Sequence, residues 1–405
     1  MPPPRRFGSL SRPGISVEHR SLPVRPLGIV RCDVAGVIGF LRRMAWPEGA
    51  SAGDFIEVTL RRIRELDEHP QALLFDGPSR RCARSFFENG GDQLHLFAVC
   101  IDDDGDLRAP NPDDGPLKPL FDRLRAEDDI ALLACPSAAY LRCEVLRSGA
   151  VRSDADELYE VLLAHCHEMT NRFLVLDAPR GLHGDLLLRW FYDFQRRKPE
   201  HKAFGAIYYP WLRKGDAIFP PSGAVMGAFA RNELERPPWG VGWPPANIPL
   251  IGVTHAEVDL DWADAGQVAE SGINPFITQP GRGVVIWGAR TMSLDPRWLF
   301  INSRRVVSMV TEQLRRDNEW AVFEVNDPSL WKVIERDCMV RLDEFWAAGL
   351  LSGTRPGNEF SVECNEVNNR SVDRDSGQLN VYVRLRPVGT TERIFIDLRL
   401  GSPGS

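Results

Sequence analysis

The sequence has no long apolar run, and this absence limits the kinds of protein that it can encode. No stretch approaches the roughly 20 consecutive apolar residues that a membrane-spanning helix requires. Residues 1–14 contain arginines but are followed by no apolar core, so we expect no export signal. The sequence therefore predicts a protein that is made in the cytoplasm and does not insert into a membrane.

Paired cysteines and an excess of positive charge are also missing. The eight cysteines include no C-x-x-C pair, which is the usual spacing in redox and zinc sites. Since no export signal is expected, we predict reduced and mostly buried thiols. The formal net charge is −7, from 49 basic and 56 acidic residues, whereas nucleic-acid-binding proteins usually have a basic surface. We therefore expect no nucleic-acid partner.

The common motifs of catalysis are absent as well. The chain has no nucleophile elbow, no cluster of metal ligands and no cofactor-binding loop. We therefore expect no enzymatic activity, no cofactor and no metal. One alternative is an α/β enzyme that uses Asp177, because Asp177 follows a predicted strand and open α/β sheets bind ligands at the carboxyl ends of their strands. An isolated aspartate in such a place more often caps a turn.

Two patterns resemble ligand sites only in part. Gly283 and Gly288 have the spacing of a phosphate-binding loop, but Ala289 and Arg290 stand where that loop needs Lys and Ser or Thr. The four residues between the glycines are apolar, so we predict a strand closed by glycine turns. The acidic segment 102–115 has the aspartate spacing of a calcium loop but lacks its glycine and its glutamate. We expect a solvated turn there.

What the sequence does contain is a regular alternation of short apolar segments and amphipathic segments. The 405 residues exceed one ordinary core, so two or three domains are expected. Strands that alternate with helices of this length predict a parallel sheet with helices on its faces, and hence an α/β fold. The expected strands are 34–41, 94–101, 129–135, 172–176 and 203–209, and the expected helices are 54–66, 79–87, 154–169, 184–197 and 222–230.

The C-terminal third predicts a second unit, of the α+β class. Glycines on both sides of 284–287 indicate a short buried strand. One helix is expected to begin near Asn302, a good N-cap, and another at Asp327-Pro328, where proline suits the first helical position. Between these helices, residues 320–323 are all apolar and predict a further buried strand.

The segment 235–249 is rich in Pro, Gly and Trp and marks the best domain boundary. We therefore expect four parts. They are an N-terminal arm, an α/β domain, a C-terminal core domain of the α+β class and a C-terminal strand arm, at residues 1–22, 23–248, 249–378 and 379–405.

Both ends of the chain carry short alternating strands on tethers. Apolar residues alternate with polar ones near residue 16. Over 393–400, Ile394, Ile396, Leu398 and Leu400 face one way, and Arg393, Asp397 and Arg399 face the other. A terminal strand that is unpaired within its own subunit has a free edge, which invites pairing with another chain. We predict that the subunit interface includes Ile15, Val17, Val381, Val383, Ile394, Ile396 and Leu398.

A series of short motifs follows in order along nearly the whole chain. They are Pro13-Gly14, Phe86-Phe87-Glu88-Asn89-Gly90-Gly91, Tyr208-Tyr209-Pro210-Trp211-Leu212, Pro220-Pro221-Ser222-Gly223, Pro245-Ala246-Asn247, Gly272-Ile273-Asn274, Trp287-Gly288-Ala289-Arg290-Thr291, Asp295-Pro296, Arg304-Arg305, Asn326-Asp327 and Leu330-Trp331. Each motif alone is weak. In this order they resemble the tail sheath proteins of contractile phage tails and related injection systems. The sequence departs from the family at Asn302-Ser303, where Asn-Val is usual before the paired arginines.

This resemblance implies a structural subunit and no cofactor. Such sheath proteins stack as hexameric rings into a helical tube around an inner tail tube, and their terminal arms donate strands to neighbouring subunits. Contraction drives the inner tube through a target envelope. The implied partners are other copies of the chain, the inner tube protein, and the baseplate and tail cap or terminator proteins.

The resemblance also implies a place in the cell and leaves one structural alternative. The particle, a phage tail or a tail-like injection system, would be assembled in the cytoplasm, with extracellular release left open. A non-contracting or baseplate-proximal ring component of the same kind of particle is the alternative role.

Overall fold

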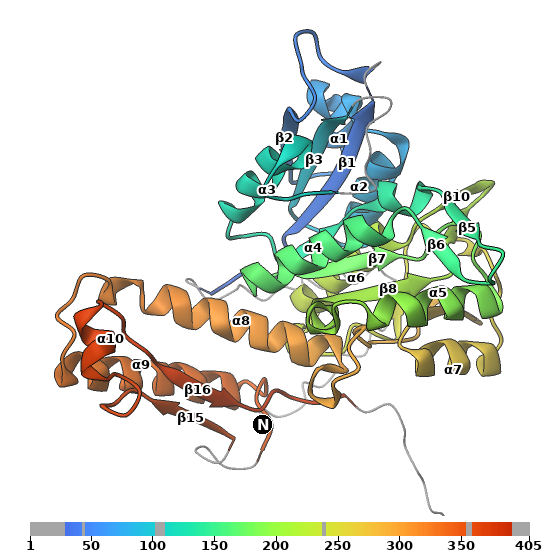
Figure 1. The fold of residues 1–405 in the computed structure, drawn as a ribbon. Helices are drawn as coiled ribbons and strands as arrows, with labels where there is room; N and C mark the ends of the chain where they lie inside the picture. Colours follow the sequence, from blue (N-terminus) through green and yellow to red (C-terminus); the bar gives the residue numbers. More distant parts are fainter. Residues whose placement is uncertain (1–28, 43–44, 102–109, 237–239, 354–358, 391–405) are drawn as a thin grey trace, which may run out of the picture.

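The computed structural model describes residues 29–42, 45–101, 110–236, 240–353 and 359–390. A large α/β body carries a narrower unit built from two long helices and a pair of strands (Figure 1). Within these described ranges, no helix is both long and apolar enough to cross a membrane.

A twisted sheet runs through the α/β body. In the described residues it has nine strands in the order β11-β14-β13-β8-β7-β4-β1-β3-β2. The pairs from β13 to β3 are parallel, whereas β2, β14 and β11 pair antiparallel at the two edges. The strands are β1 (Ala35–Arg42), β2 (Phe55–Leu60), β3 (Leu94–Ile101), β4 (Leu132–Ala134), β7 (Phe173–Asp177), β8 (Gly205–Tyr209), β11 (Ile248–Pro249), β13 (Asn274–Gln279) and β14 (Gly283–Ile286).

Helices cover both faces of this sheet, because successive strand residues point to opposite faces. On β1, Ile38 and Phe40 join one apolar core, and Val37 and Leu41 join the other. The first core is closed by α3 (Lys118–Arg125), α4 (Asp156–Met169) and α5 (Gly184–Arg196), and the second by α2 (Gly77–Glu88) and α6 (Ser222–Glu235). The predicted α/β fold is confirmed.

Glycines let α2 and α6 pack backbone to backbone. A Cβ atom on Gly223 would lie 2.2 Å from the carbonyl oxygen of Cys82, and one on Gly227 would lie 2.3 Å from that of Phe86. Only glycine allows such an approach. This contact explains why a helix on the sheet carries two glycines one turn apart.

Short elements complete the body. The helix α7 places Ala265 against Ile277 of β13 and Val285 of β14. All eight cysteines are free, and only Cys143 is more than marginally exposed, so the prediction of reduced and mostly buried thiols agrees with the structure. The remaining elements are α1 (Glu65–Glu68), β5 (Cys143–Val145), β6 (Val151–Ser153), β9 (Leu212–Lys214), β10 (Ala217–Phe219), β12 (His255–Ala256) and α7 (Trp262–Ser271).

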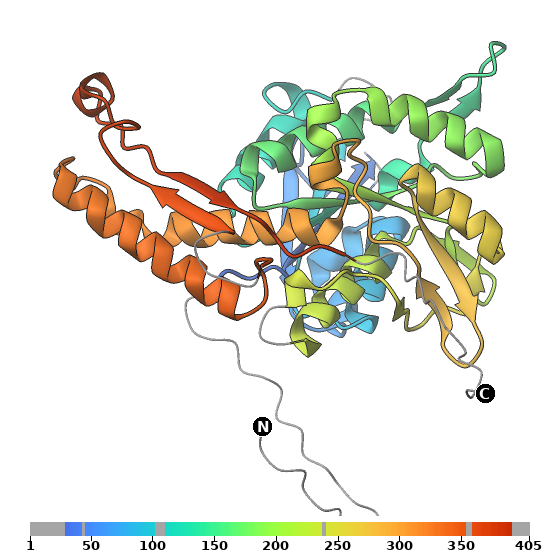
Figure 2. The same cartoon turned by 90° about the horizontal axis from the view of Figure 1, so that it is seen from below.

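The narrower unit contains α8 (Ile301–Asp317), α9 (Pro328–Ala347), β15 (Phe360–Glu363), α10 (Ser371–Asp375) and β16 (Tyr382–Leu385). Its α8 lies between the α/β body and the rest of the unit (Figure 1). Arg305 of α8 donates to the carbonyl of Cys32 at 2.6 Å and thereby ties the helix to the body. Seen from below, α9 and the β15–β16 pair project away from the body (Figure 2).

The expected starts of both long helices agree with the structure. The helix α8 begins at Ile301, next to the predicted start, but the prediction that Asn302 caps it is wrong. The N-cap residue is Phe300, and the side chain of Asn302 donates to the carbonyl of Gly242 at 3.1 Å. The carboxylate of Asp327 accepts from the backbone N–H groups of Ser329 and Leu330, both at 2.9 Å, so it caps α9 as expected.

The predicted helix 54–66 is wrong. Residues 55–60 form β2, which pairs antiparallel with β3. Val58 and Leu60 are buried while Thr59 is exposed, a period of two that suits an edge strand. The segment has apolar residues at spacings that also fit a helix, and strand pairing with β3 decides between the two.

The predicted buried strand at 320–323 is also wrong. Residues Glu319–Ala321 form a short 3-10 turn, and the side chains that follow point into solvent. Val322 is 62 % exposed and Phe323 is fully exposed. No neighbouring strand of the described structure pairs with this segment, so its apolar composition cannot indicate burial.

The predicted division near residue 248 stays a prediction. Segments on both sides of residue 248 contribute to the same sheet, since β13 pairs with β8 through Asn274 and Tyr208. The segments before and after residue 248 therefore contribute to one sheet and to one apolar core.

Candidate assembly surface

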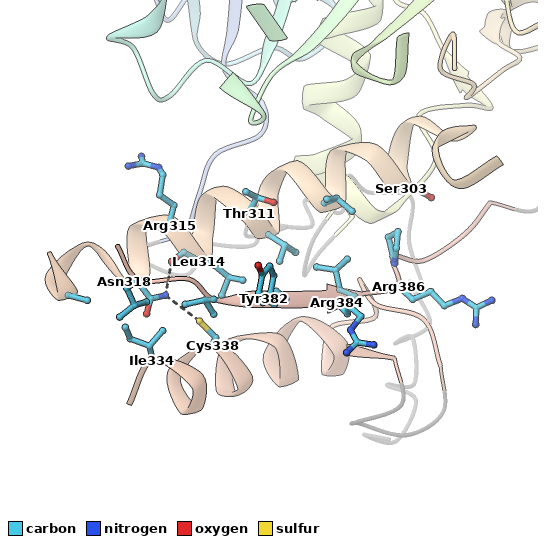
Figure 3. Close-up of a pocket in the computed structure, with 18 of the residues that line it drawn as sticks. Ser303, Thr311, Leu314, Arg315, Asn318, Ile334, Cys338, Tyr382, Arg384 and Arg386 are labelled. Atoms are coloured by element: carbon cyan, nitrogen blue, oxygen red, sulfur yellow. Dashed lines mark hydrogen bonds between the residues drawn. The ribbon is translucent and has the colours of Figure 1, made fainter. Parts of the chain in front are cut away.

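A long apolar groove separates α8 from β16. Its volume is about 1740 Å³. The helix contributes Val307, Val310 and Leu314, and the strand contributes Val383 and Leu385, while the first turns of α9 close the end. Figure 3 shows β16 running between α8 and α9, with Tyr382 and Arg384 on the strand. The groove is long enough to hold an extended segment.

The edge of β16 that borders this groove is unpaired in the described part of the chain. β15 pairs with β16 on the other side, and no β15 residue lines the groove. Arg386 donates its N–H to the carbonyl of Glu359 at 2.9 Å. Because inward and outward backbone groups alternate along an antiparallel strand, the N–H and C=O groups of Val383 and Leu385 point into the groove. These groups can accept another strand.

An apolar loop forms the rim of the groove beyond α8. Val322, Phe323 and Val325 are 62 %, 104 % and 76 % exposed, and the first two line the groove. Phe323 also has a left-handed backbone with φ of 72°, which costs free energy for a residue with a side chain. Exposed apolar residues that cluster beside a groove are typical of an interaction surface.

The structure brings two of the predicted interface residues to this surface. Val381 and Val383 are half-buried and line the groove. The other five predicted interface residues lie outside the described residues; they are Ile15, Val17, Ile394, Ile396 and Leu398. Sequence reasoning missed the wall that α8 contributes, although the apolar stripe on that helix was visible in the sequence.

Asp177 occupies a closed position. Its side chain is 1 % exposed, and its Oδ1 accepts from the N–H of Ser222 at 2.7 Å, which caps α6. The hydroxyl of Tyr159 donates to the carbonyl of Asp177 at 3.0 Å. Burial raises the pKa of Asp177 to about 7. The geometry favours a structural cap over a catalytic carboxylate, since the charged form is disfavoured and the side chain has a backbone partner.

The two glycines with phosphate-loop spacing flank β14. Val284, Val285 and Ile286 are fully buried within the sheet, and a Cβ on Gly288 would lie 2.7 Å from Oδ1 of Asn274. The segment is a core strand, as predicted, and has no room for a phosphate.

One cluster has the composition of a metal site. Ligand atoms of Glu57, His95 and Glu127 lie within 4.8 Å of one another. The guanidinium of Arg123 donates to both carboxylates, at 2.7 Å and 2.9 Å to Glu57 and at 2.8 Å to Glu127. One guanidinium already pairs with both acids, so the cluster is an ion-pair network.

Comparison with protein families decides between a structural protein and an enzyme. Residues 200–292 match the model of the phage tail sheath protein central domain, and residues 293–400 match that of the phage tail sheath C-terminal domain. The chain belongs to the tail sheath protein family. Members of this family are structural proteins and not enzymes, so the enzyme hypothesis based on Asp177 is set aside.

Individual tail sheath proteins show the same relationship at low identity. The chain is 25 % identical over 171 residues to the tail sheath protein of Vibrio phage KVP40, a match that covers 41 % of this chain and 24 % of that protein. It is 25 % identical over 184 residues to the tail sheath protein of Escherichia phage P2, covering 44 % and 43 %. The matches thus span less than half the length of these relatives.

Solved structures extend the likeness to nearly the whole chain. A chain of the anti-feeding prophage baseplate superposes with a TM-score of 0.70 and 22 % identity, covering 97 % of this chain and 99 % of that one. A chain of the PVC sheath complex in its contracted state gives a TM-score of 0.70 and 21 % identity, covering 97 % and 98 %. These likenesses establish a sheath-type fold.

Proposed function

We propose that this protein is a subunit of a contractile sheath. Copies of it polymerise as stacked hexameric rings around an inner tube, and contraction of the sheath drives that tube through a target envelope. The observation that carries the proposal is the unpaired edge of β16 beside an apolar groove. Family membership supports a structural role, and the described fold supplies a surface suited to strand addition.

The groove fits a tethered strand from a neighbouring copy. In the predicted C-terminal strand, Ile394, Ile396 and Leu398 share one face, and Arg393, Asp397 and Arg399 lie on the other. One face of that strand can therefore pack on apolar groove residues while its backbone pairs with the outward groups of Val383 and Leu385. The predicted N-terminal strand at Ile15 and Val17 has the same alternation and is the second proposed donor.

Strand addition through tethers also suits a lattice that changes shape. Rigid bodies can rotate while main-chain contacts between copies persist, because the tethers take up the movement. The free energy for contraction is then a difference in packing between two lattices, and no catalytic group is needed. We further propose the four-part division at residues 22, 248 and 378, assembly in the cytoplasm, and contacts with inner tube, baseplate and tail cap proteins.

Removal of either arm tests the proposal. Deleting residues 1–20, or residues 391–405, is expected to leave a folded monomer that forms no tubes. The second cut spares Thr390, whose hydroxyl donates to Oδ1 of Asn302 at 2.7 Å. Loss of a strand with three or four backbone hydrogen bonds should raise the assembly threshold by about a hundredfold or more. Thermal unfolding and electron microscopy give the two readouts.

A shorter deletion provides the control for the C-terminal arm. Removing residues 401–405 takes away the chain beyond the predicted strand 393–400 and should leave assembly unchanged. Normal tubes formed by either arm-deleted variant would show that the arms do not join the subunits.

A further inference from the structure

The guanidinium of Arg304 has no polar partner among the described residues. Arg304 lies in the first turn of α8 and is only 7 % exposed. Its Nε is buried without a hydrogen-bond acceptor. Its guanidinium carbon lies 4.4 Å from the ring centre of Trp298 and 4.5 Å from that of Phe204. Two aromatic walls thus hold a cation whose hydrogen-bond donors are unused by the described residues.

The next residue in the helix, Arg305, is a buried arginine that does have hydrogen-bond acceptors in its own subunit. Arg305 is equally buried, but its Nη2 donates to the carbonyl of Cys32 at 2.6 Å and lies 3.5 Å from the carboxylate of Glu233. For Arg304, burial alone lowers the pKa to about 10, and no carboxylate offsets this effect. Among the described residues, Arg305 therefore has hydrogen-bond acceptors and Arg304 has none.

A buried cation without an acceptor is a cost that aromatic contact offsets only in part. The planar fork of a guanidinium suits the two oxygens of a carboxylate. The chain carries 56 acidic against 49 basic residues, so copies of it have carboxylates to spare. The 7 % of Arg304 that stays exposed is where such a group can approach.

We infer that Arg304, between Trp298 and Phe204, is a receptor site for a carboxylate of a second copy of this chain. Docking of that carboxylate completes the site in the assembled sheath. The inference rests on the self-assembly proposed above, and it adds a contact that involves no strand exchange. It also assigns different roles to the paired arginines: Arg305 holds its own subunit together, and Arg304 recognises the neighbour.

The monomer tests this assignment without any assembly. Replacing Arg304 by methionine fills the space between the rings with an apolar chain and removes the unsatisfied charge. We expect the melting temperature of the R304M monomer to equal that of the wild type or to exceed it by a few degrees. A decrease of several degrees would show that Arg304 stabilises its own subunit, and the inference would then be overturned whether or not the wild type forms tubes.

Assembly gives the second readout. Both R304M and R304A should raise the protein concentration needed for tube formation by about 10- to 100-fold, because a charge-assisted contact is lost at each interface. Millimolar guanidinium should restore assembly of R304A by entering the vacated slot, whereas urea, which is planar but uncharged, should not. The control is R336A, which removes an exposed arginine that pairs with Asp337 in its own subunit and does not line the groove.

Each outcome of the assembly experiment decides one point. If R304M forms tubes at the wild-type concentration, the charged contact proposed for Arg304 is refuted. It is also refuted if urea and guanidinium restore the assembly of R304A equally well. An effect of Arg304 that emerges only when the inner tube protein is added overturns the assignment to a second copy. A wild-type chain that never assembles refutes the proposed function instead, and the melting temperature of R304M still decides the status of Arg304.

Discussion

Replacing Val383 by proline is expected to raise the protein concentration needed for tube formation strongly and to leave the subunit folded. The N–H of Val383 points into the groove, away from β15, so its loss removes no hydrogen bond between described residues. Proline is tolerated on an edge strand when the missing N–H would face outward. The incoming strand loses one hydrogen bond and meets the proline ring. We expect a loss of about 1–3 kcal/mol per contact, or roughly 10- to 100-fold in the assembly threshold.

Alanine at the same position is the matched control. V383A also shortens the side chain but keeps the N–H that the neighbouring strand would use. It should form tubes at nearly the wild-type concentration, as measured by light scattering and electron microscopy. Equal behaviour of V383P and V383A in assembly would show that the edge of β16 accepts no strand.

The second large effect concerns the dependence of stability on pH, and it arises at Asp177. Burial raises the pKa of this carboxyl to about 7 in the folded protein, against about 3.9 in an unfolded chain. The native state therefore holds a proton that the unfolded state releases as the pH rises. The contribution of Asp177 to stability is fully present below about pH 4 and is lost progressively up to about pH 7.

The variant D177N should remove this dependence. Asparagine can still accept the hydrogen bond from Ser222 but carries no charge at any pH. The free energy of unfolding of D177N should therefore gain roughly 2–3 kcal/mol on that of the wild type between about pH 5 and about pH 8. Urea titrations across this range measure it, and D185N, which changes an exposed aspartate, is the control. Parallel pH profiles for D177N and the wild type would contradict a raised pKa at this buried cap.

The sequence predicted the parts of the fold in which composition, spacing and environment agree. The strand β3 and the caps of α9 follow from local patterns, since an apolar run or an Asp-Pro pair has few other uses. The region 54–66 was misassigned because helix spacing and strand alternation both fit its apolar residues. Only the pairing of β2 with β3 settles the choice, and pairing between distant segments is invisible in a local pattern.

The assembly surface also could not be predicted from local sequence patterns. The apolar run at 320–323 looks like core, yet Phe323 is fully exposed. The proposed assembly explains this exposure, because part of the apolar surface would then contact other copies. Arg304 and Arg305 are indistinguishable in sequence. Only the packed structure shows that Arg305 has an acceptor in the carbonyl of Cys32 and that Arg304 has none in the described residues.

The central claim is that this chain builds a sheath from copies of itself. The most direct test is to express the full-length chain, alone and together with its inner tube protein, and to image both preparations by negative-stain electron microscopy. We expect long, wide tubes with a cogwheel cross-section. A single ring of subunits would instead support a baseplate-proximal component. Monomers in both preparations would contradict the account.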